Sequence, residues 1–275
     1  MQRRASIPAR INIIGEHTDY LGGLALPFAS EHRLVLTATK ADHTEGDATV
    51  VELWRAVGGW PATLEVESTI PIGAGMSSSA ALCLAVVLCA NGQMEPLDAC
   101  LEAQKIEHQV LKTPCGLLDQ MAMMMSNKDH ATLIDFTAMT WKAFPIPEPW
   151  MFKLVDSGVR RQLNQTEFGT SVDSSVLQHH ATEENRRVRQ ALDSTSFELG
   201  KLLNASHTSL QSIGVSTPGV DALVSKLQMT PGVLGARMMG GGFGGMILIA
   251  VDDHEVVPEA PLLKPSRGGF LEEFL

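Results

Sequence analysis

The chain has 275 residues, of which 44% are apolar, and its 21 Lys and Arg against 31 Asp and Glu give a formal charge of −10. This length and composition allow a full hydrophobic core, and the acidic balance argues against a nucleic-acid partner. The longest apolar run, 80–90, is too short to span a bilayer, and the N-terminal residues lack the apolar core of a signal peptide. We therefore expect a cytoplasmic protein without a membrane partner.

Apolar periodicity and turn residues divide the chain into alternating strands and helices. Strands are expected at 10–14, 34–39, 64–68, 131–136 and 151–155. Helices are expected at 77–89, which Asn91-Gly92 stops, at 96–111, from Pro114 onward, and at 173–192, 198–210 and 220–228. Residues 235–251 read as strand, glycine loop and strand. The cluster Pro145, Pro147, Pro149 is the best linker candidate, which predicts domains at 1–147 and 148–275.

The segment 71–82, PIGAGMSSSAAL, joins an alternating strand to an apolar helix. Gly73 and Gly75 can adopt positive φ and let the backbone approach an anion, while the serines can cap the helix and offer hydroxyls. The positive end of the helix dipole favours negative charge at this point. The segment lacks the lysine of the Walker loop, so it is either a phosphate-binding loop of another kind or a glycine turn before a well-capped helix.

A second glycine-rich segment, MMGGGFGGM at 238–246, formally satisfies the dinucleotide fingerprint GxGxxG. That fingerprint requires a helix after the glycines, whereas the β-branched run ILIAV follows here. We therefore expect a hairpin whose bare backbone packs against another loop or a ligand.

A third cluster places Glu16, His17 and Asp19 within four positions after the first strand, in RINIIGEHTDY. Carboxylates accept hydrogen bonds from hydroxyls and Arg10 can donate them, so the cluster suits a polyol. Metal ligation by His17 and Asp19, or an ordinary solvated turn, are the alternatives.

Asp119 lies in the third expected helix among Leu118, Met121, Ala122 and Met123. A carboxylate in apolar company is either a surface residue or a functional group held in a cleft. Phosphoryl transfer requires bound phosphates, neutralised charge and an acceptor hydroxyl near a carboxylate, and the four segments together supply those parts.

In this order, RINIIGEHTDYLGG, IPIGAGMSSSAAL, PCGLLDQ and ARMMGGGFGG resemble the GHMP small-molecule kinases and, through GEHTDY, their galactokinase branch. The resemblance implies an α+β fold of two lobes, an N-terminal ribosomal-protein-like lobe and a C-terminal ferredoxin-like lobe, with the active site between them. It implies an ATP-dependent sugar 1-kinase, most simply one for galactose, that uses Mg²⁺ and is a monomer.

Carried over by position, the resemblance also implies roles for particular residues. Asp119 would accept or orient the proton of the anomeric hydroxyl, with Arg10 beside it to hold charge. The residues that would line the sugar are Arg10, Glu16, His17, Asp19, Gly116, Asp119 and Phe168. The residues that would hold ATP are Gly73, Gly75, Ser77, Ser78, Ser79, Ala80, Gly241 and Gly242. Ser78 and Glu107 would hold Mg²⁺.

The chain departs from the family pattern at Phe168, where galactokinases usually have Tyr. The segment between the first two motifs and the region after Phe168 are also shorter than usual, and Trp54 is expected on the adenine side. The lost hydroxyl leaves open a kinase for N-acetylgalactosamine, arabinose or a uronic acid. A sugar and ATP sensor without catalysis is the second class of function, although Ala80 and Ala81, together with Arg10 and Asp119, favour an enzyme.

Overall fold

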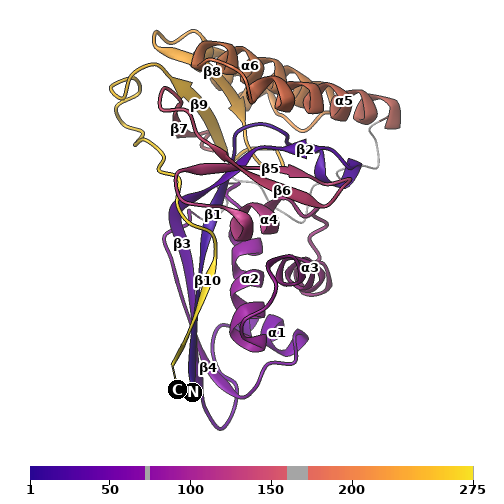
Figure 1. Cartoon of the computed structure of the whole chain (residues 1–275), viewed down its shortest axis with the longest axis vertical. Coiled ribbons are helices and arrows are strands. Elements are labelled where there is room, and N and C mark those ends of the chain that lie inside the picture. The colour runs from indigo at the N-terminus through magenta and orange to yellow at the C-terminus, as the bar shows by residue number, and fades with distance from the viewer. Residues whose placement is uncertain (72–74, 160–172, 275) are drawn as a thin grey trace.

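The computed structural model describes residues 1–71, 75–159 and 173–274. They form a helix-covered sheet below and two further sheets with long helices above (Figure 1). The lower sheet is antiparallel. Its strands in spatial order are β10 (Phe270–Phe274), β1 (Gln2–Asn12), β3 (Pro27–Lys40) and β4 (Ala62–Ser68).

One face of the lower sheet is covered by helices (Figure 1). They are α1 (Ala48–Ala56), α2 (Ser78–Asn91), α3 (Pro96–Ile106) and α4 (Leu118–Met125). Helix α2 contacts β1 and β3 while α1 and α3 pack on its other sides, which explains why it is apolar all round rather than amphipathic. It ends at Gly92, whose φ of 85° and N–H to the carbonyl of Leu88 form the expected stop. A π-helical turn, Glu107–Leu111, continues α3.

The upper part of the molecule contains two further sheets. The middle one joins β2 (Leu24–Ala25), β5 (His130–Asp135) and β6 (Thr140–Pro145), and the top one joins β7 (Met151–Asp156), β9 (Met246–Val251) and β8 (Val233–Met238). Helices α5 (Ser174–Ala191), α6 (Ser196–Ser212) and α7 (Pro218–Gln228) complete this part. Helices α6 and α7 pack on β8, and α5 contacts both α6 and β2, so α5 reaches the loop between β1 and β2.

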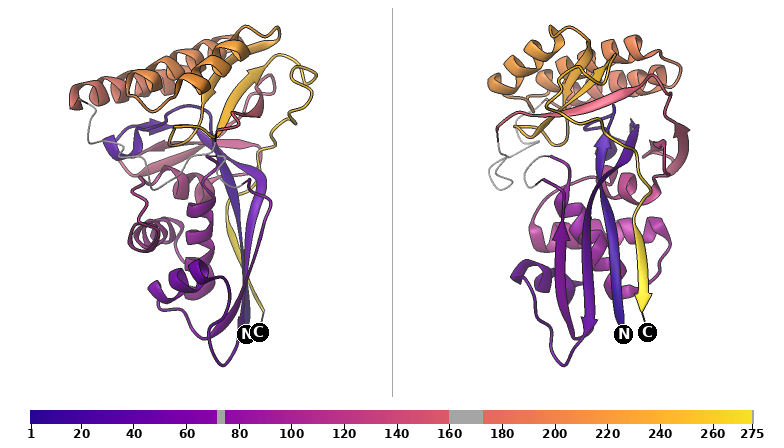
Figure 2. Two further views of the ribbon diagram at one scale, coloured as in Figure 1. Left: turned by 180° about the vertical axis from the view of Figure 1, so that it is seen from behind. Right: turned by 90° about the vertical axis from the view of Figure 1, so that its left-hand side faces the viewer.

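The C-terminal segment returns to the lower sheet, where β10 pairs with β1 and Phe274 faces Gln2. The two termini therefore lie side by side (Figure 2). The expected boundary near residue 147 falls in the connection between β6 and β7. The division into domains at 1–147 and 148–275 stays a prediction. Strand β10, which lies in the second of these ranges, belongs to the sheet formed by the first.

Most expected elements are present, and the differences have local causes. The strand expected at 10–14 is the end of the much longer β1, and β3 likewise extends well beyond 34–39. The helix expected from Pro114 begins only at Leu118. Before it, the backbone at Gly116 lies directly against the carboxylate of Asp19. The sequence patterns do not predict helix α1 or strands β2, β6 and β10. Trp54 is fully buried in α1 and donates to the carbonyl of Trp60, so it is part of the core. Its expected place on the adenine side stays a prediction.

Among residues 1–71, 75–159 and 173–274, no single helix is long and apolar enough to cross a membrane. Within these described ranges, one pair of helices, Ser78–Asn91 and Pro96–Leu111, meets that requirement jointly, and it is bent by 116°.

Candidate active site

Arg10 lies where the pairing of β1 with β3 shifts register, after Pro8. Irregularities of this kind redirect side chains. The side chain is 3% exposed; its Nε donates to Asp119 Oδ1 at 2.8 Å and its Nη1 donates to the carbonyl of Gly75 at 2.5 Å. Burial alone would lower the pKa of Arg10, but the charges of Asp119 and Glu16 outweigh it and raise that pKa. One guanidinium thus connects the lower sheet, α4 and the glycine loop.

Asp119 occupies the first turn of α4 and remains 25% exposed. Its partner Arg10 is almost completely enclosed, so Asp119 is the member of the pair that a ligand can reach. Asp119 is therefore a partly exposed carboxylate that is paired with a buried guanidinium, and its catalytic role stays a prediction.

The glycine and serine loop is described from Gly75 onward, and Gly73 lies outside the described residues. Gly75 has a φ of 69° and Ser77, at the N-cap of α2, has a φ of 60°. The serine cap predicted for this helix is absent at Ser77, whose side chain makes no cap hydrogen bond. The first N–H groups of α2 therefore lack the usual capping hydroxyl, and such groups are the donors that bind anions at helix N-termini.

Glu107 is a buried carboxylate, 2% exposed, at the end of α3. Ser79 Oγ donates to its Oε1 at 2.7 Å and Gln120 Nε2 donates to its Oε2 at 2.8 Å. Burial raises the pKa of Glu107 to about 7, and the charge of Asp119 adds to the shift. The hydroxyl that contacts Glu107 is thus that of Ser79, one residue beyond the expected Ser78, which begins α2.

Glu16 joins the loop after β1 to the glycine hairpin between β8 and β9. Its Oε1 accepts from the N–H of Gly240 at 2.6 Å and lies 3.5 Å from Arg237 Nη2. Burial favours a neutral carboxyl, but Arg10 and Arg237 overcome that effect and lower the pKa of Glu16. An ionised glutamate that is 3% exposed excludes the alternative of an ordinary solvated turn.

Asp19, Gly116 and His17 lie beside this loop and α4. Asp19 Oδ2 accepts from the N–H of Leu118 at 3.1 Å, and it faces Gly116 so closely that a Cβ there would overlap the carboxylate. Burial raises the pKa of Asp19 to about 6. His17, with a φ of 56°, contacts Tyr20 Oη through Nδ1 at 3.1 Å. In the described parts of the chain, no group of three or more His, Cys, Asp and Glu has a metal-binding arrangement.

The glycine hairpin contacts the glycine and serine loop through Gly240. A Cβ on Gly240 would lie 2.8 Å from the carbonyl of Gly75, and its φ is +80°. Gly242 instead packs against the carbonyl of Val215, away from the loop, while Gly241 is half-buried between them. The expectation that the bare backbone of this hairpin packs against another loop is therefore confirmed at Gly240. Phe168 lies outside the described residues.

Sequence reasoning missed two residues that build this site. Arg237 is fully buried on β8, and its Nε donates to the carbonyl of Ile13 at 2.8 Å. Gln120, next to Asp119, is also fully buried and holds Glu107. The charge of Arg237 in an otherwise apolar strand was a readable signal, whereas nothing local distinguishes Gln120.

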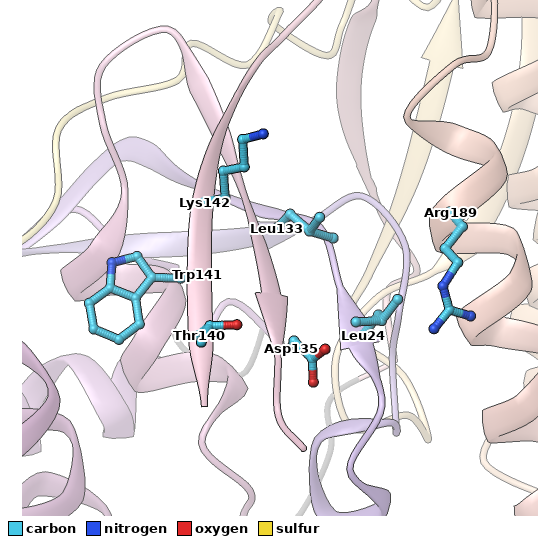
Figure 3. A pocket seen from close by; sticks show the side chains of 7 residues that line it. All are labelled: Leu24, Leu133, Asp135, Thr140, Trp141, Lys142 and Arg189. Atoms are coloured by element: carbon cyan, nitrogen blue, oxygen red, sulfur yellow. The ribbon is translucent and has the colours of Figure 1, made fainter. Parts of the chain in front are cut away.

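A separate surface hollow of about 350 Å³ lies over the middle sheet (Figure 3). Its lining residues are Leu24, Leu133, Asp135, Thr140, Trp141, Lys142 and Arg189. Asp135 Oδ1 accepts from the N–H groups of Thr137 and Ala138, so it stabilises a turn. The hollow contains none of the residues expected for sugar or phosphate.

The fold is that of a GHMP kinase. Two solved structures share it: Lactococcus lactis galactokinase complexed with galactose, with a TM-score of 0.84 and 22% identity over 98% of this chain and 95% of that one, and Methanococcus jannaschii mevalonate kinase, with a TM-score of 0.71 and 14% identity over 96% and 98%. The family models for the GHMP kinase N-terminal and C-terminal domains match residues 47–127 and 189–260, and the galactokinase galactose-binding signature matches residues 3–40.

Sequence relatives agree with the fold. Galactokinase of Thermotoga maritima is 32% identical over 309 aligned positions, which cover 90% of this chain and 88% of the relative, and galactokinase of Haemophilus influenzae is 29% identical over 91% and 85%. The chain belongs to the GHMP kinase family, in its galactokinase branch, and is a phosphotransferase with an alcohol group as acceptor. The 309 positions exceed the 275 residues of the chain, so the relatives contain segments that this chain lacks.

Proposed function

We propose that the chain transfers the γ-phosphoryl group of ATP to the anomeric hydroxyl of galactose, giving galactose 1-phosphate and ADP. The observation that carries this proposal is the buried Arg10, which hydrogen-bonds both Asp119 and the carbonyl of Gly75. A partly exposed carboxylate thereby lies next to the loop that is suited to phosphate, which is the spatial relationship that a kinase needs between acceptor and donor.

The sugar end of the proposed site is formed by the loop after β1 and the start of α4. Glu16, His17 and Asp19 lie within the stretch that matches the galactose-binding signature, and Gly116 contacts Asp19. Carboxylates accept hydrogen bonds from sugar hydroxyls, and the absence of a side chain at Gly116 leaves the Asp19 carboxylate in place. We assign sugar binding to these residues together with Arg10, Asp119 and Phe168.

The phosphate end is formed by the loop before α2. Backbone N–H groups around Gly75 and Ser77 and the N-terminus of α2 would hold the phosphates of ATP, with Gly73, Ser79 and Ala80 in the same segment. Gly240 supports this loop from the hairpin, and Gly241 and Gly242 complete that hairpin.

The residues near Glu107 fit Mg²⁺ by their chemistry. The carboxylate of Glu107 and the hydroxyl of Ser78, whose neighbour Ser79 hydrogen-bonds Glu107, are hard oxygen donors of the kind that Mg²⁺ prefers. Mg²⁺ usually retains waters and phosphate oxygens as its other ligands. Burial raises the pKa of Glu107 and so disfavours its ionised form. A cation next to this carboxylate would stabilise the ionised form. When bound there, Mg²⁺ would neutralise phosphate charge.

In the proposed reaction the anomeric oxygen forms a bond to the γ-phosphorus as the bond between that phosphorus and the β,γ-bridging oxygen breaks. Asp119 accepts or orients the hydroxyl proton, and ADP leaves with the electron pair of the broken bond. Arg10 holds the Asp119 carboxylate in position. Because Arg10 also donates to the carbonyl of Gly75, it fixes the position of this carboxylate relative to the loop before α2.

The sequence leaves related sugars open as alternative substrates. Phe168 replaces a tyrosine hydroxyl, and one hydrogen bond contributes about 0.5–1.5 kcal/mol, which is enough to shift preference toward N-acetylgalactosamine, arabinose or a uronic acid. A panel of these sugars with ATP and Mg²⁺, monitored by ADP release and by detection of the sugar 1-phosphate, separates the possibilities. Fastest transfer to galactose supports the proposal, faster transfer to another sugar supports the alternative, and binding of galactose and ATP without any transfer would support a sensor. We further propose that the protein is cytoplasmic and a monomer. Sedimentation of the purified protein tests its oligomeric state.

A further inference from the structure

Glu184 is a buried carboxylate on α5 that faces the loop after β1. It is 0% exposed. Its Oε1 accepts from the backbone N–H of Gly15 at 3.1 Å and from Ser206 Oγ at 2.6 Å, and its Oε2 accepts from Arg187 Nε at 2.6 Å. Both oxygens are therefore occupied, and one of them holds a backbone group of the loop that carries Glu16, His17 and Asp19.

Two neighbours on α5 hold the same loop. His180, one turn before Glu184, places Nε2 2.9 Å from the carbonyl of Glu16 and Nδ1 2.7 Å from Ser209 Oγ. A carbonyl only accepts, so Nε2 carries the proton and Nδ1 accepts from the serine. Burial lowers the pKa of His180, in keeping with a neutral ring. Asn185 Oδ1 accepts from the N–H of Leu24 at 2.7 Å.

These contacts reach both ends of the segment 15–24 from a helix more than 150 residues later in the chain. The segment has little regular structure of its own, only the 3₁₀ turn Asp19–Leu21 before β2. Gly15 has a φ of +101° and packs against the backbone of Leu24 and Ala25. Within the segment, Thr18 Oγ1 donates to the carbonyls of Gly15 and Leu24 at 2.9 Å each. The N–H groups of Gly15 and Leu24 and the carbonyl of Glu16 instead bond side chains of α5, which supplies partners that buried backbone groups require.

We infer that α5 positions the sugar loop, with Glu184 as the main positioning residue, which holds Gly15 while His180 holds Glu16 and Asn185 holds Leu24. The effect on sugar binding rests on the proposed function, whereas the contacts between α5 and the loop do not depend on it. Glu184 acts through the loop and does not itself contact the sugar.

The first test compares Glu184→Gln with Glu183→Gln, its neighbour on α5. Glu183 is partly exposed and pairs with Arg186 at the surface, so its substitution is the matched control. Glu184→Gln weakens the hold on Gly15, and we expect the KM for galactose to rise about tenfold, with the KM for ATP changed less than twofold. Hydrogen exchange in the peptide covering 13–24 should become faster, while that in the peptide covering 77–90 does not. Equal changes in both KM values, or no change beyond that of Glu183→Gln, would overturn the inference.

A second comparison covers the case in which Glu184→Gln fails to fold. His180→Leu removes the donor to Glu16, whereas His180→Gln keeps an N–H in place of Nε2, so galactose KM and exchange in 13–24 should change with leucine and recover with glutamine. If neither variant differs from the wild type, α5 does not position the loop. If the wild type transfers no phosphate to galactose, the proposed function fails, and the exchange comparison still decides whether α5 holds the loop.

Discussion

Arg10 and Asp119, 109 residues apart in the chain, are joined by a 2.8 Å hydrogen bond between Nε and Oδ1. The same guanidinium bonds the carbonyl of Gly75, which in turn lies against Gly240. Gly240 donates its N–H to Glu16 in the loop after β1. These contacts form a continuous chain from Asp119, the proposed base, through the loop at Gly75 and the hairpin at Gly240 to the loop after β1. A substitution at one of these groups should therefore affect the others.

Asp119→Asn tests the proposed base. Asparagine keeps an oxygen that can accept from Arg10 Nε, so the fold and sugar binding should survive, but an amide cannot take a proton. We expect kcat to fall by about 10²–10⁴-fold, measured by ADP release, with the dissociation constant for galactose changed only a few-fold by calorimetry. Asp98→Asn, at an exposed position in the first turn of α3, is the control. A wild-type kcat in Asp119→Asn would show that Asp119 is not the catalytic group.

Arg10→Lys tests whether the shape of the guanidinium matters in addition to its charge. A lysine ammonium is a compact charge that does not reproduce the geometry in which Nε bonds Asp119 and Nη1 bonds Gly75. We expect kcat to fall about 10²-fold and the KM for ATP to rise, because the phosphate loop loses its link.

The control for this substitution is Arg4→Lys on the same strand. Arg4 is 48% exposed and lies 3.7 Å from Glu272, far outside the site. Steady-state kinetics of both variants give the comparison. If the two substitutions had the same effect, charge alone would account for the role of Arg10.

The sequence predicted those parts of the site that depend on local patterns. The loop at 75–80, the apolar α2 and the β8–β9 hairpin follow from glycine placement and periodicity, and Asp119 and Arg10 follow from ordered motifs. The contacts of Glu16 with Gly240 and of Glu184 with Gly15 join residues 224 and 169 positions apart, and no local pattern encodes such pairs. Strand β10 was missed for a similar reason, since Phe270–Phe274 is short and partly charged and becomes a strand only by pairing with β1.

Gly240→Ala tests the contact between hairpin and phosphate loop. An added Cβ would lie 2.8 Å from the carbonyl of Gly75, so the loop or the hairpin must move, and the φ of +80° adds backbone strain. Gly58→Ala is a matched control, because Gly58 has a φ of +73° and a Cβ added there would meet no other atom within 4 Å. We expect both variants to lose roughly 1 kcal/mol of stability from strain, but only Gly240→Ala to raise the KM for ATP. Nucleotide binding that is equal in the two variants would contradict the role of this contact.

Glu107→Gln tests the buried carboxylate through pH. Burial raises the pKa of Glu107 from an ordinary 4.5 to about 7, so between these values the folded protein holds a proton that the unfolded chain has released. The contribution of Glu107 to stability is therefore fully present below pH 4.5 and falls as pH rises to about 7, by on the order of 3 kcal/mol. Glutamine does not titrate, so the Tm of the variant minus that of the wild type should increase from pH 5 to pH 8. The same carboxylate must be ionised to bind a cation, so the Mg²⁺ affinity of the wild type should rise over this interval and that of Glu107→Gln should stay low.

The control for Glu107→Gln is Glu102→Gln on α3, where Glu102 pairs with Lys105. A Tm difference between Glu107→Gln and the wild type that did not vary with pH would show that Glu107 is already ionised at pH 5.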